Sequence, residues 1–109
     1  MILSDIYTIL KATGYPVAYS HFTDTPNNPL PNPPYITYVS AYSSNFKADN
    51  KIYHKIDNLQ IELYTNKKDL QAEKILEDIL YTNEIAYETT ETWIDSERLF
   101  QKIYEVRLI

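Results

Sequence analysis

A chain of 109 residues with a net charge of −5, no cysteine and a single glycine has the size of one domain, and its composition excludes several classes of function. No cysteine means no disulfide framework, thiolate zinc site or cysteine nucleophile, and one glycine excludes a glycine-rich nucleotide-binding loop. The excess of 15 acidic over 10 basic residues argues against nucleic acid as the main ligand. We expect residues 1–109 to form one domain with neither a membrane span nor a signal peptide.

The first predicted element is a helix over residues 2–13. Its apolar residues recur at the spacing of one helical face: Leu3, Ile6, Tyr7 and Leu10. Gly14 is placed where a left-handed residue commonly ends a helix, and the residue before Pro16 is disfavoured in a helix. We expect a short extended segment over residues 17–22 to follow.

The next segment, residues 23–34, contains five of the six prolines and can form neither a helix nor a central strand. It could be a polyproline ligand for a proline-recognising domain. It could instead be a stiff surface connector, and we favour this second interpretation.

A hairpin is predicted after the proline-rich loop. Residues 35–42 are rich in β-branched and aromatic side chains, residues 43–50 form a polar turn that contains Phe46, and residues 51–64 return as the partner strand. The alternation of apolar residues changes parity between Ile56 and Leu59, so we expect a bulge or a bend near residues 57–58.

A second helix is predicted over residues 67–81. Asn66 is the expected N-cap, with Asp69 in the first turn, where a carboxylate suits the helix dipole. The apolar stripe of this helix comprises Ala72, Ile75, Leu76, Ile79 and Leu80.

A second hairpin ends the chain, with strands at residues 85–94 and 99–109 and a turn at residues 95–98. The last strand places Phe100, Tyr104, Val106 and Leu108 on one face, whereas Ile103 lies on the polar face. The order helix–hairpin–helix–hairpin predicts an α+β fold, with two helices packed on one face of a mostly antiparallel sheet of about four strands.

The side chains that could carry chemistry do not form a recognisable set. The two histidines, His21 and His54, lack a nearby third ligand, so a metal site is not expected. Glu84 and Glu88 could be imagined as a glycosidase-like pair, but a solvated sheet face explains them more simply. We expect no catalytic residue, no metal site and no cofactor.

Five segments of the sequence are characteristic when taken together: residues 10–22 (LKATGYPVAYSHF), 33–38 (PPYITY), 45–53 (NFKADNKIY), 59–69 (LQIELYTNKKD) and 87–104 (YETTETWIDSERLFQKIY). They resemble a small protein of long-tailed phages and prophages of Gram-positive bacteria, and the likeness covers nearly the whole chain. That protein is similar to the tail-terminator or tail-completion proteins, which act in head–tail joining. The proline-rich loop is longer than the resemblance leads us to expect.

The resemblance implies a structural role and an α+β fold with helices on one face of a sheet. In that family a ring of subunits, usually six, caps the tail tube and presents it to the head, without a cofactor. The implied partners are further copies of this chain, the tail tube protein and a head-completion protein. The implied location is the host cytoplasm during assembly and then the head–tail junction of the virion. A head-completion role would fit the same residues.

A ring joins one patch of each subunit to a different patch of the next. Phe46 is a candidate apolar anchor, although it could simply cover its own hairpin, and Glu97 with Arg98 could form an ion pair between subunits. The candidate interface residues are Asn45, Phe46, Lys47, Asp49, Asn50, Glu97 and Arg98. Two other classes stay open: a small acidic intracellular adaptor or inhibitor that binds a single protein partner, and an unrecognised enzyme.

Overall fold

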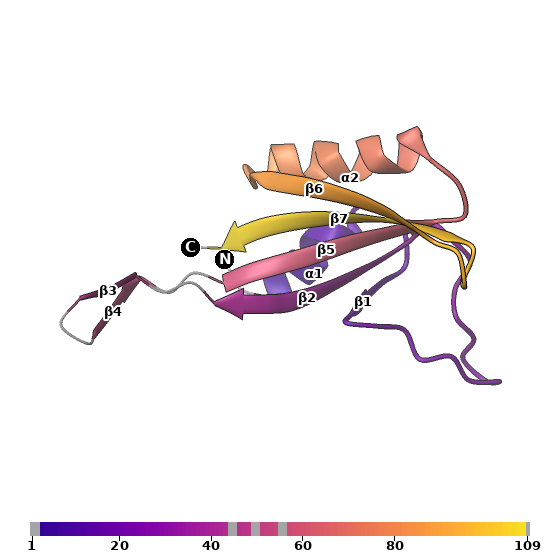
Figure 1. Cartoon of the computed structure of the whole chain (residues 1–109), viewed down its shortest axis with the longest axis horizontal. Coiled ribbons are helices and arrows are strands. Elements are labelled where there is room, and N and C mark those ends of the chain that lie inside the picture. The colour runs from indigo at the N-terminus through magenta and orange to yellow at the C-terminus, as the bar shows by residue number, and fades with distance from the viewer. Residues whose placement is uncertain (1–2, 44–45, 49–50, 55–56, 109) are drawn as a thin grey trace.

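The computed structural model describes residues 3–43, 46–48, 51–54 and 57–108. Two helices lie against a five-stranded sheet, and a separate two-stranded hairpin projects beyond one end of that sheet (Figure 1). The elements are α1 (Leu3–Lys11), β1 (Val17–Tyr19), β2 (Tyr35–Ser43), β3 (Phe46–Ala48), β4 (Lys51–His54), β5 (Asp57–Thr65), α2 (Leu70–Thr82), β6 (Tyr87–Ile94) and β7 (Leu99–Leu108).

The strand order in the main sheet is β1-β2-β5-β7-β6. The pairs β2–β5, β5–β7 and β7–β6 are antiparallel, with Ile61 opposite both Tyr38 and Tyr104. β1 instead runs parallel to β2 and pairs Val17 with Ile36. The α+β class and the antiparallel part of the sheet are therefore confirmed. The expectation of about four strands was too low, because the short extended segment after α1 joins the sheet as a fifth, parallel strand.

The predicted strand over residues 51–64 is wrong as one continuous element. Its first part, β4, pairs with β3, and only its second part, β5, pairs with β2. Residues 43–50, predicted as a turn, contain β3. The expected irregularity does occur opposite the start of β5, but it lies on β2, where the register shifts between Ser40 and Tyr42. Ala41 is the extra residue of β2, because its neighbours Ser40 and Tyr42 pair with the consecutive residues Leu59 and Asn58 of β5.

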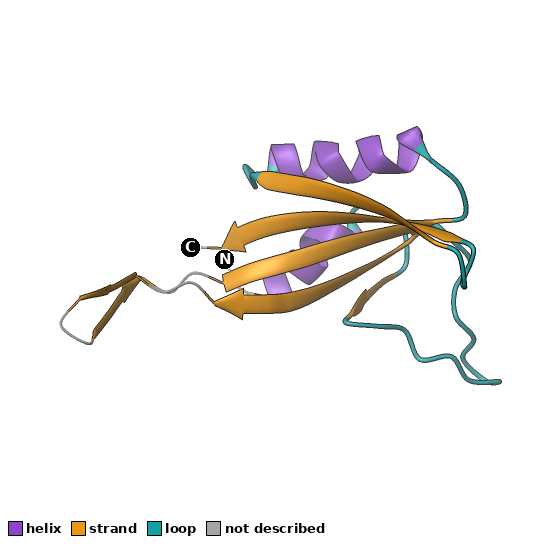
Figure 2. Cartoon of the chain, viewed as in Figure 1, coloured by secondary structure: helices purple, strands orange, loops and turns teal. Residues whose placement is uncertain are grey.

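Both helices cover the same face of the sheet, as predicted, and the loops run around its ends (Figure 2). Alternate residues of each strand point to that face, so their side chains join one core with the apolar stripes of the helices. The fully buried members are Ile6, Leu10, Ile36, Leu59, Ile61, Leu63, Leu76, Leu80, Tyr104 and Val106. The other face carries no helix, and Glu62, Gln101 and Ile103 lie on it.

Local capping residues set the ends of the helices. Gly14 has φ +86° and its N–H donates to the carbonyl of Lys11, which confirms its predicted left-handed role. The prediction that Asn66 is the N-cap of the second helix is wrong. α2 begins at Leu70, and the carboxylate of Asp69 accepts a hydrogen bond of 3.0 Å from the N–H of Ala72. Asp69 lies directly before the first apolar turn, so its side chain reaches the exposed N–H groups that Asn66 cannot.

This capping bond gives a direct test of where α2 begins. We expect Asp69→Ala to lower the free energy of unfolding by about 1 kcal/mol, the usual loss for an N-cap. The matched variant Asn66→Ala should leave it nearly unchanged. Urea unfolding followed by circular dichroism measures both, and an equal effect of the two substitutions would contradict this start of the helix.

Candidate functional site

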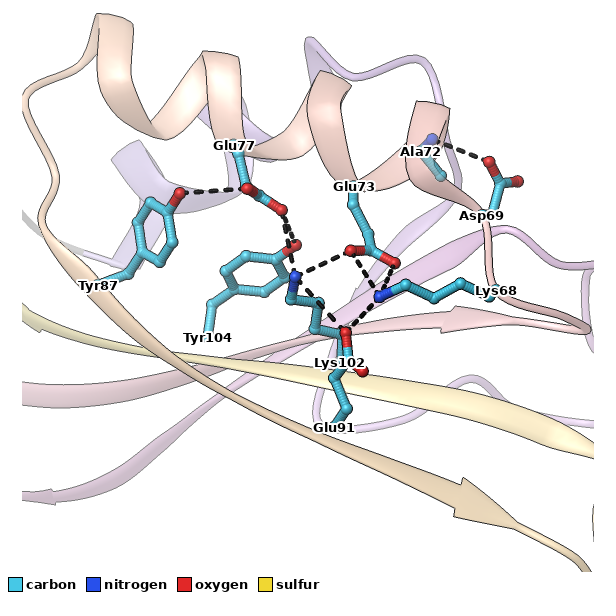
Figure 3. Close-up of polar contacts among 9 residues, drawn as sticks. All are labelled: Lys68, Asp69, Ala72, Glu73, Glu77, Tyr87, Glu91, Lys102 and Tyr104. Carbon is cyan, nitrogen blue, oxygen red and sulfur yellow. Dashed lines mark hydrogen bonds and ion pairs between the residues drawn. The ribbon is translucent and has the colours of Figure 1, made fainter.

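A cluster of charged side chains lies between α2 and the sheet (Figure 3). Glu73 and Glu77 are one turn apart on α2, so both side chains leave the same side of the helix. Lys102 on β7 and Glu91 on β6 are directly opposite each other in the strand register. Lys68 approaches from the loop before α2. The sequence thus brings two lysines and three glutamates together at the border of the core.

Glu73 is the centre of this cluster and is only 8% exposed. Its carboxylate lies 2.8 Å from the Nζ of Lys68 and 2.8 Å from the Nζ of Lys102. Lys68 also contacts Glu91, and Lys102 lies 3.7 Å from the same Glu91 carboxylate. Each buried charge therefore has an opposite charge beside it, which is the condition for burial at tolerable cost.

Two tyrosines extend the cluster into the core. The hydroxyl of Tyr104, which is fully buried, donates a hydrogen bond of 2.7 Å to Glu77. The hydroxyl of Tyr87 donates to the other oxygen of the same carboxylate at 3.3 Å. Burial, followed by the hydrogen bond and the charge of Glu77, raises the pKa of Tyr104 far above the ordinary 10.0. Tyr104 thus stays protonated and acts as a hydrogen-bond donor.

The protonation states of the charged members follow from their partners. Burial alone would raise the pKa of Glu73, but the hydrogen bonds from Lys102 and Lys68 outweigh it and hold this pKa below the ordinary 4.5. Burial alone would lower the pKa of Lys102, but the hydrogen bond and charge of Glu73 hold it above 10.5. Both groups are ionised at neutral pH, so neither is poised to transfer a proton.

This arrangement anchors α2 and does not resemble an active site. A general base needs a pKa near the working pH, and the shifts of Glu73 and Lys102 move the pKa of each away from neutrality. Within the described ranges no group of three or more histidine, aspartate or glutamate side chains is arranged to hold a metal ion. His21 is exposed and bonds to Ser20, while the side chain of His54 lies outside the described part of the structure.

The predicted interface residues lie at two opposite ends of the sheet. Phe46 and Lys47 belong to β3 in the projecting hairpin (Figure 1), whereas Asn45, Asp49 and Asn50 lie outside the described residues. Glu97 and Arg98 are exposed in the β6–β7 turn at the far end. The N–H groups of Glu97 and Arg98 donate to Ile94 and Asp95, and Arg98 has φ +55°. The structure does not bring the two tips together within one chain.

The proline-rich segment is a surface connector with local hydrogen bonds. Thr25 bridges Asn28, and the N–H of Leu30 donates to the carboxylate of Asp24 at 3.1 Å. The peptide bond between Pro33 and Pro34 is cis.

The helix-free face has a polar cluster of its own near the β6–β7 turn. The hydroxyl of Tyr64 donates to Glu62, and the Nε2 of Gln101 donates to both of these groups at 2.9–3.0 Å. Burial and the bond to Glu62 raise the pKa of Tyr64 above its ordinary value. The rings of Tyr35 and Tyr64 stack, and Phe22 from the start of the loop packs edge-on against Tyr35.

The opposite end of the helix-free face contains a groove of about 630 Å³ that sequence reasoning missed. Its lining comes from β2, β5, β7 and β6 and from the loop between α2 and β6. The lining includes Ala41, Asn58, Gln60, Asn83, Glu84, Ile85, Ala86, Tyr87, Glu88, Glu105 and Arg107. Glu84 and Glu88 do both lie here, but Glu84 is in the loop with φ +58° rather than on a strand. The sequence shows the acidic residues Glu84 and Glu88 near the start of β6, but it does not show that β2 and β5 contribute to the same groove.

Comparisons of the chain with protein-family models, with curated proteins and with solved structures find no match. Among the described helices, none has the length and apolar character needed to cross a membrane.

The ion cluster predicts a specific pH dependence of stability. The pKa of Glu73 is lower in the folded chain than its ordinary value of 4.5, so its stabilisation is present above pH 4.5 and is lost as the pH falls through the folded-state pKa. We expect Glu73→Gln to lower the free energy of unfolding by about 1–3 kcal/mol at pH 7, since the mostly buried Lys102 loses a charged partner. This deficit should shrink below pH 4.5, as measured by urea unfolding at each pH.

Asp78→Asn is the matched control on the same helix. Asp78 pairs with Lys74 on the surface, where both side chains are more than half exposed. Its loss should change stability by less than about 0.5 kcal/mol at every pH. A pH-independent deficit for Glu73→Gln would contradict an ionised Glu73 in the cluster.

Proposed function

We propose that this chain is a non-enzymatic structural protein of the head–tail connector of a long-tailed phage or prophage. It forms a ring that caps the tail tube and joins the tube to the head. Two lines of support are the resemblance, which covers nearly the whole chain, and the α+β architecture with helices on one face of a sheet. That architecture is the one the resemblance implies.

The observation that carries the proposal is the hairpin formed by β3 and β4, called the arm below. It is a separate two-stranded sheet that stands beyond the end of the main sheet (Figure 1). An isolated two-stranded hairpin is marginally stable in water and becomes stable when a further strand or an apolar surface covers it. The arm therefore fits a protein whose final contacts are made with a neighbouring subunit.

The positions of the two tips suit a ring. The arm leaves one end of the sheet, and the turn with Glu97 and Arg98 lies at the other end (Figure 1). A closed ring is built from unlike patches on each subunit, and two distinct tips supply unlike patches. An ion pair at the Glu97–Arg98 rim would contribute little, about 0–1 kcal/mol, so the apolar residues of the arm are the main candidates for assembly.

The absence of turnover is part of the proposal. Glu73 and Lys102, whose pKa values are both shifted, pair with each other and hold α2 to the sheet. The small acidic adaptor is the alternative, and it predicts a monomer that binds one partner.

Phe46 provides the test of the arm as an assembly element. We expect Phe46→Ala to leave the thermal unfolding of the domain unchanged and to weaken ring assembly by at least about tenfold. A tenfold loss corresponds to about 1.4 kcal/mol, and truncating an anchor residue of an interface commonly costs more than that. Analytical ultracentrifugation over a concentration series measures assembly. Tyr81→Ala is the control, because Tyr81 is an aromatic side chain on α2 that is 85% exposed. Unchanged assembly of the Phe46 variant would remove Phe46 as an anchor.

Deletion of the gene from a phage or inducible prophage tests the role in the particle. Negative-stain electron microscopy of the lysate should show filled heads beside unattached tails of abnormal or ragged length. Normal tails beside leaking heads would place the protein on the head side of the joint. Intact virions would overturn the proposal and favour the adaptor.

A further inference from the structure

β6 is a long edge of the main sheet that is open along its outer side. It is the last strand in the order β1-β2-β5-β7-β6, and it pairs with β7 without a break from Tyr87 opposite Val106 to Ile94 opposite Leu99 (Figure 1). In the described part of the chain no strand pairs with this outer side, and residues 88–93 are all exposed. Every second residue of such a strand turns its N–H and C=O away from the sheet, so β6 presents unpaired donors and acceptors.

The two edges of the sheet differ in how they are protected against pairing with another chain. β1 has three residues and is followed by the proline-rich loop, and short strands and prolines are common protections of an edge. β6 has eight residues, with no proline, lysine, arginine or bulge. Its carboxylates are Glu88 and Glu91, and Lys68 and Lys102 already compensate the charge of Glu91. β6 is therefore a template for a further strand.

The sequence of β6 matches itself when it is reversed. Residues 87–93 read aromatic, Glu, Thr, Thr, Glu, Thr, aromatic. If two copies run antiparallel with Thr90 opposite Thr90, each glutamate meets a threonine and Tyr87 meets Trp93. Aromatic pairs across two strands stabilise a sheet, and like charges directly opposite each other destabilise it. Trp93 is 44% exposed in the single chain, so its ring is accessible to this partner.

Other registers of the same two strands fit less well. A shift of the centre by one residue brings Glu91 opposite Glu91, or else places Tyr87 opposite Glu91 and breaks the aromatic pairs. An intermediate register, with Tyr87 opposite Ile94, joins the helix-bearing face of one copy to the helix-free face of the other. With Thr90 at the centre, the two Glu88 residues are four residues apart along the strands, about 13 Å at 3.3 Å per residue.

We infer that β6 pairs antiparallel with β6 of a second copy of this chain, with Thr90 opposite Thr90. The two five-stranded sheets then continue as one, with the helices of both copies on the same face. A strand of another protein could use the same edge, but only a second copy makes use of the match of β6 to itself. The contact joins like patches, whereas a ring joins unlike ones, so it goes beyond the proposed function and describes the free chain.

The chain contains no cysteine, so a single introduced thiol reports this contact. Directly opposite residues of an antiparallel pair have Cα atoms about 4.5–5.5 Å apart, within the roughly 4.4–6.8 Å that a disulfide spans. Under a mild oxidant, we expect Thr90→Cys to form a disulfide-linked dimer at least about tenfold faster than Thr92→Cys. Thr92 is also exposed and lies on the same face, but its two copies are about 13 Å apart along the strands in this register.

A charge test examines the two-fold relation. Thr90→Lys and Thr90→Glu each place like charges directly opposite, so each should weaken the dimer at least about tenfold in sedimentation over a concentration series. An equal mixture of the two variants should restore the dimer, because opposite charges then meet. Thr8→Lys is the matched control, since Thr8 is exposed on α1, and it should leave the dimer unchanged. Thermal unfolding of each variant checks that the fold is kept.

The outcomes separate this inference from the proposed function. A chain that stays monomeric over the concentration series, equal oxidation at positions 90 and 92, or no rescue in the mixture overturns the pairing of β6 with itself. A dimer that persists unchanged in Thr90→Lys uses another surface and also overturns it. If the pairing fails but deletion of the gene leaves unattached tails, the proposed function stands alone. If the pairing is found but the virions are intact, the pairing stands and the connector role falls.

Discussion

The contact between β5 and β7 organises the molecule. Leu59, Ile61 and Leu63 alternate along β5, and the register places them beside Val106, Tyr104 and Lys102 of β7. Because side chains alternate between faces, a shift of one residue would expose this whole row. The same alternation puts Glu62, Gln101 and Glu105 on the opposite face. One constraint thus decides both where the helices pack and which face remains open.

The charged cluster fixes α2 on that sheet, and its effect reaches the groove. Glu73 and Glu77 hold the helix to Lys102 and Tyr104, so the last turn of α2 ends at a defined place. There the N–H and the side-chain amide of Asn83 both donate to the carbonyl of Ile79, and the N–H of Ile85 donates to Leu80. The loop that lines part of the groove is therefore positioned by the helix, and the ion pairs stabilise the groove indirectly.

Sequence reasoning succeeded where a single period governs a segment. Both helices, the last hairpin and the helix-bearing face of the sheet follow from repeats of 3.6 or 2 residues. It failed where two neighbouring strands have the same two-residue alternation. The sequence of residues 51–64 alternates in both β4 and β5, and only the change of parity near Leu59 indicated that β4 and β5 belong to different sheets. The capping error had a similar cause, since Asn66 and Asp69 are both good N-caps and the choice depends on where the strand before them ends.

The ion cluster and the groove were beyond prediction for a further reason. Lys102 lies 29 residues after Glu73 in the sequence, and their meeting depends on the order of strands in the sheet. The facing of Glu88 and Glu105 likewise depends on the length of the turn between β6 and β7. The extended segment over residues 17–22 was expected, but its parallel pairing with β2 was not, because the three residues of β1 are too few for a pattern to show which strand they join.

The insertion of the arm between β2 and β5 has a consequence for the folding of the domain. These two strands pair directly from Tyr35 opposite Tyr64 to Ser43 opposite Asp57, so roughly 13 residues are looped out between neighbours that a tight turn could join. Each doubling of loop length costs about 0.6 kcal/mol of closure entropy, so relative to a tight two-residue turn the insertion costs the isolated domain about 1.6 kcal/mol. The first hairpin accordingly closes more slowly than β6 and β7 do across their short turn, and we expect the C-terminal hairpin to form before it. The domain carries this entropic cost in every molecule, whether or not the arm has reached a partner.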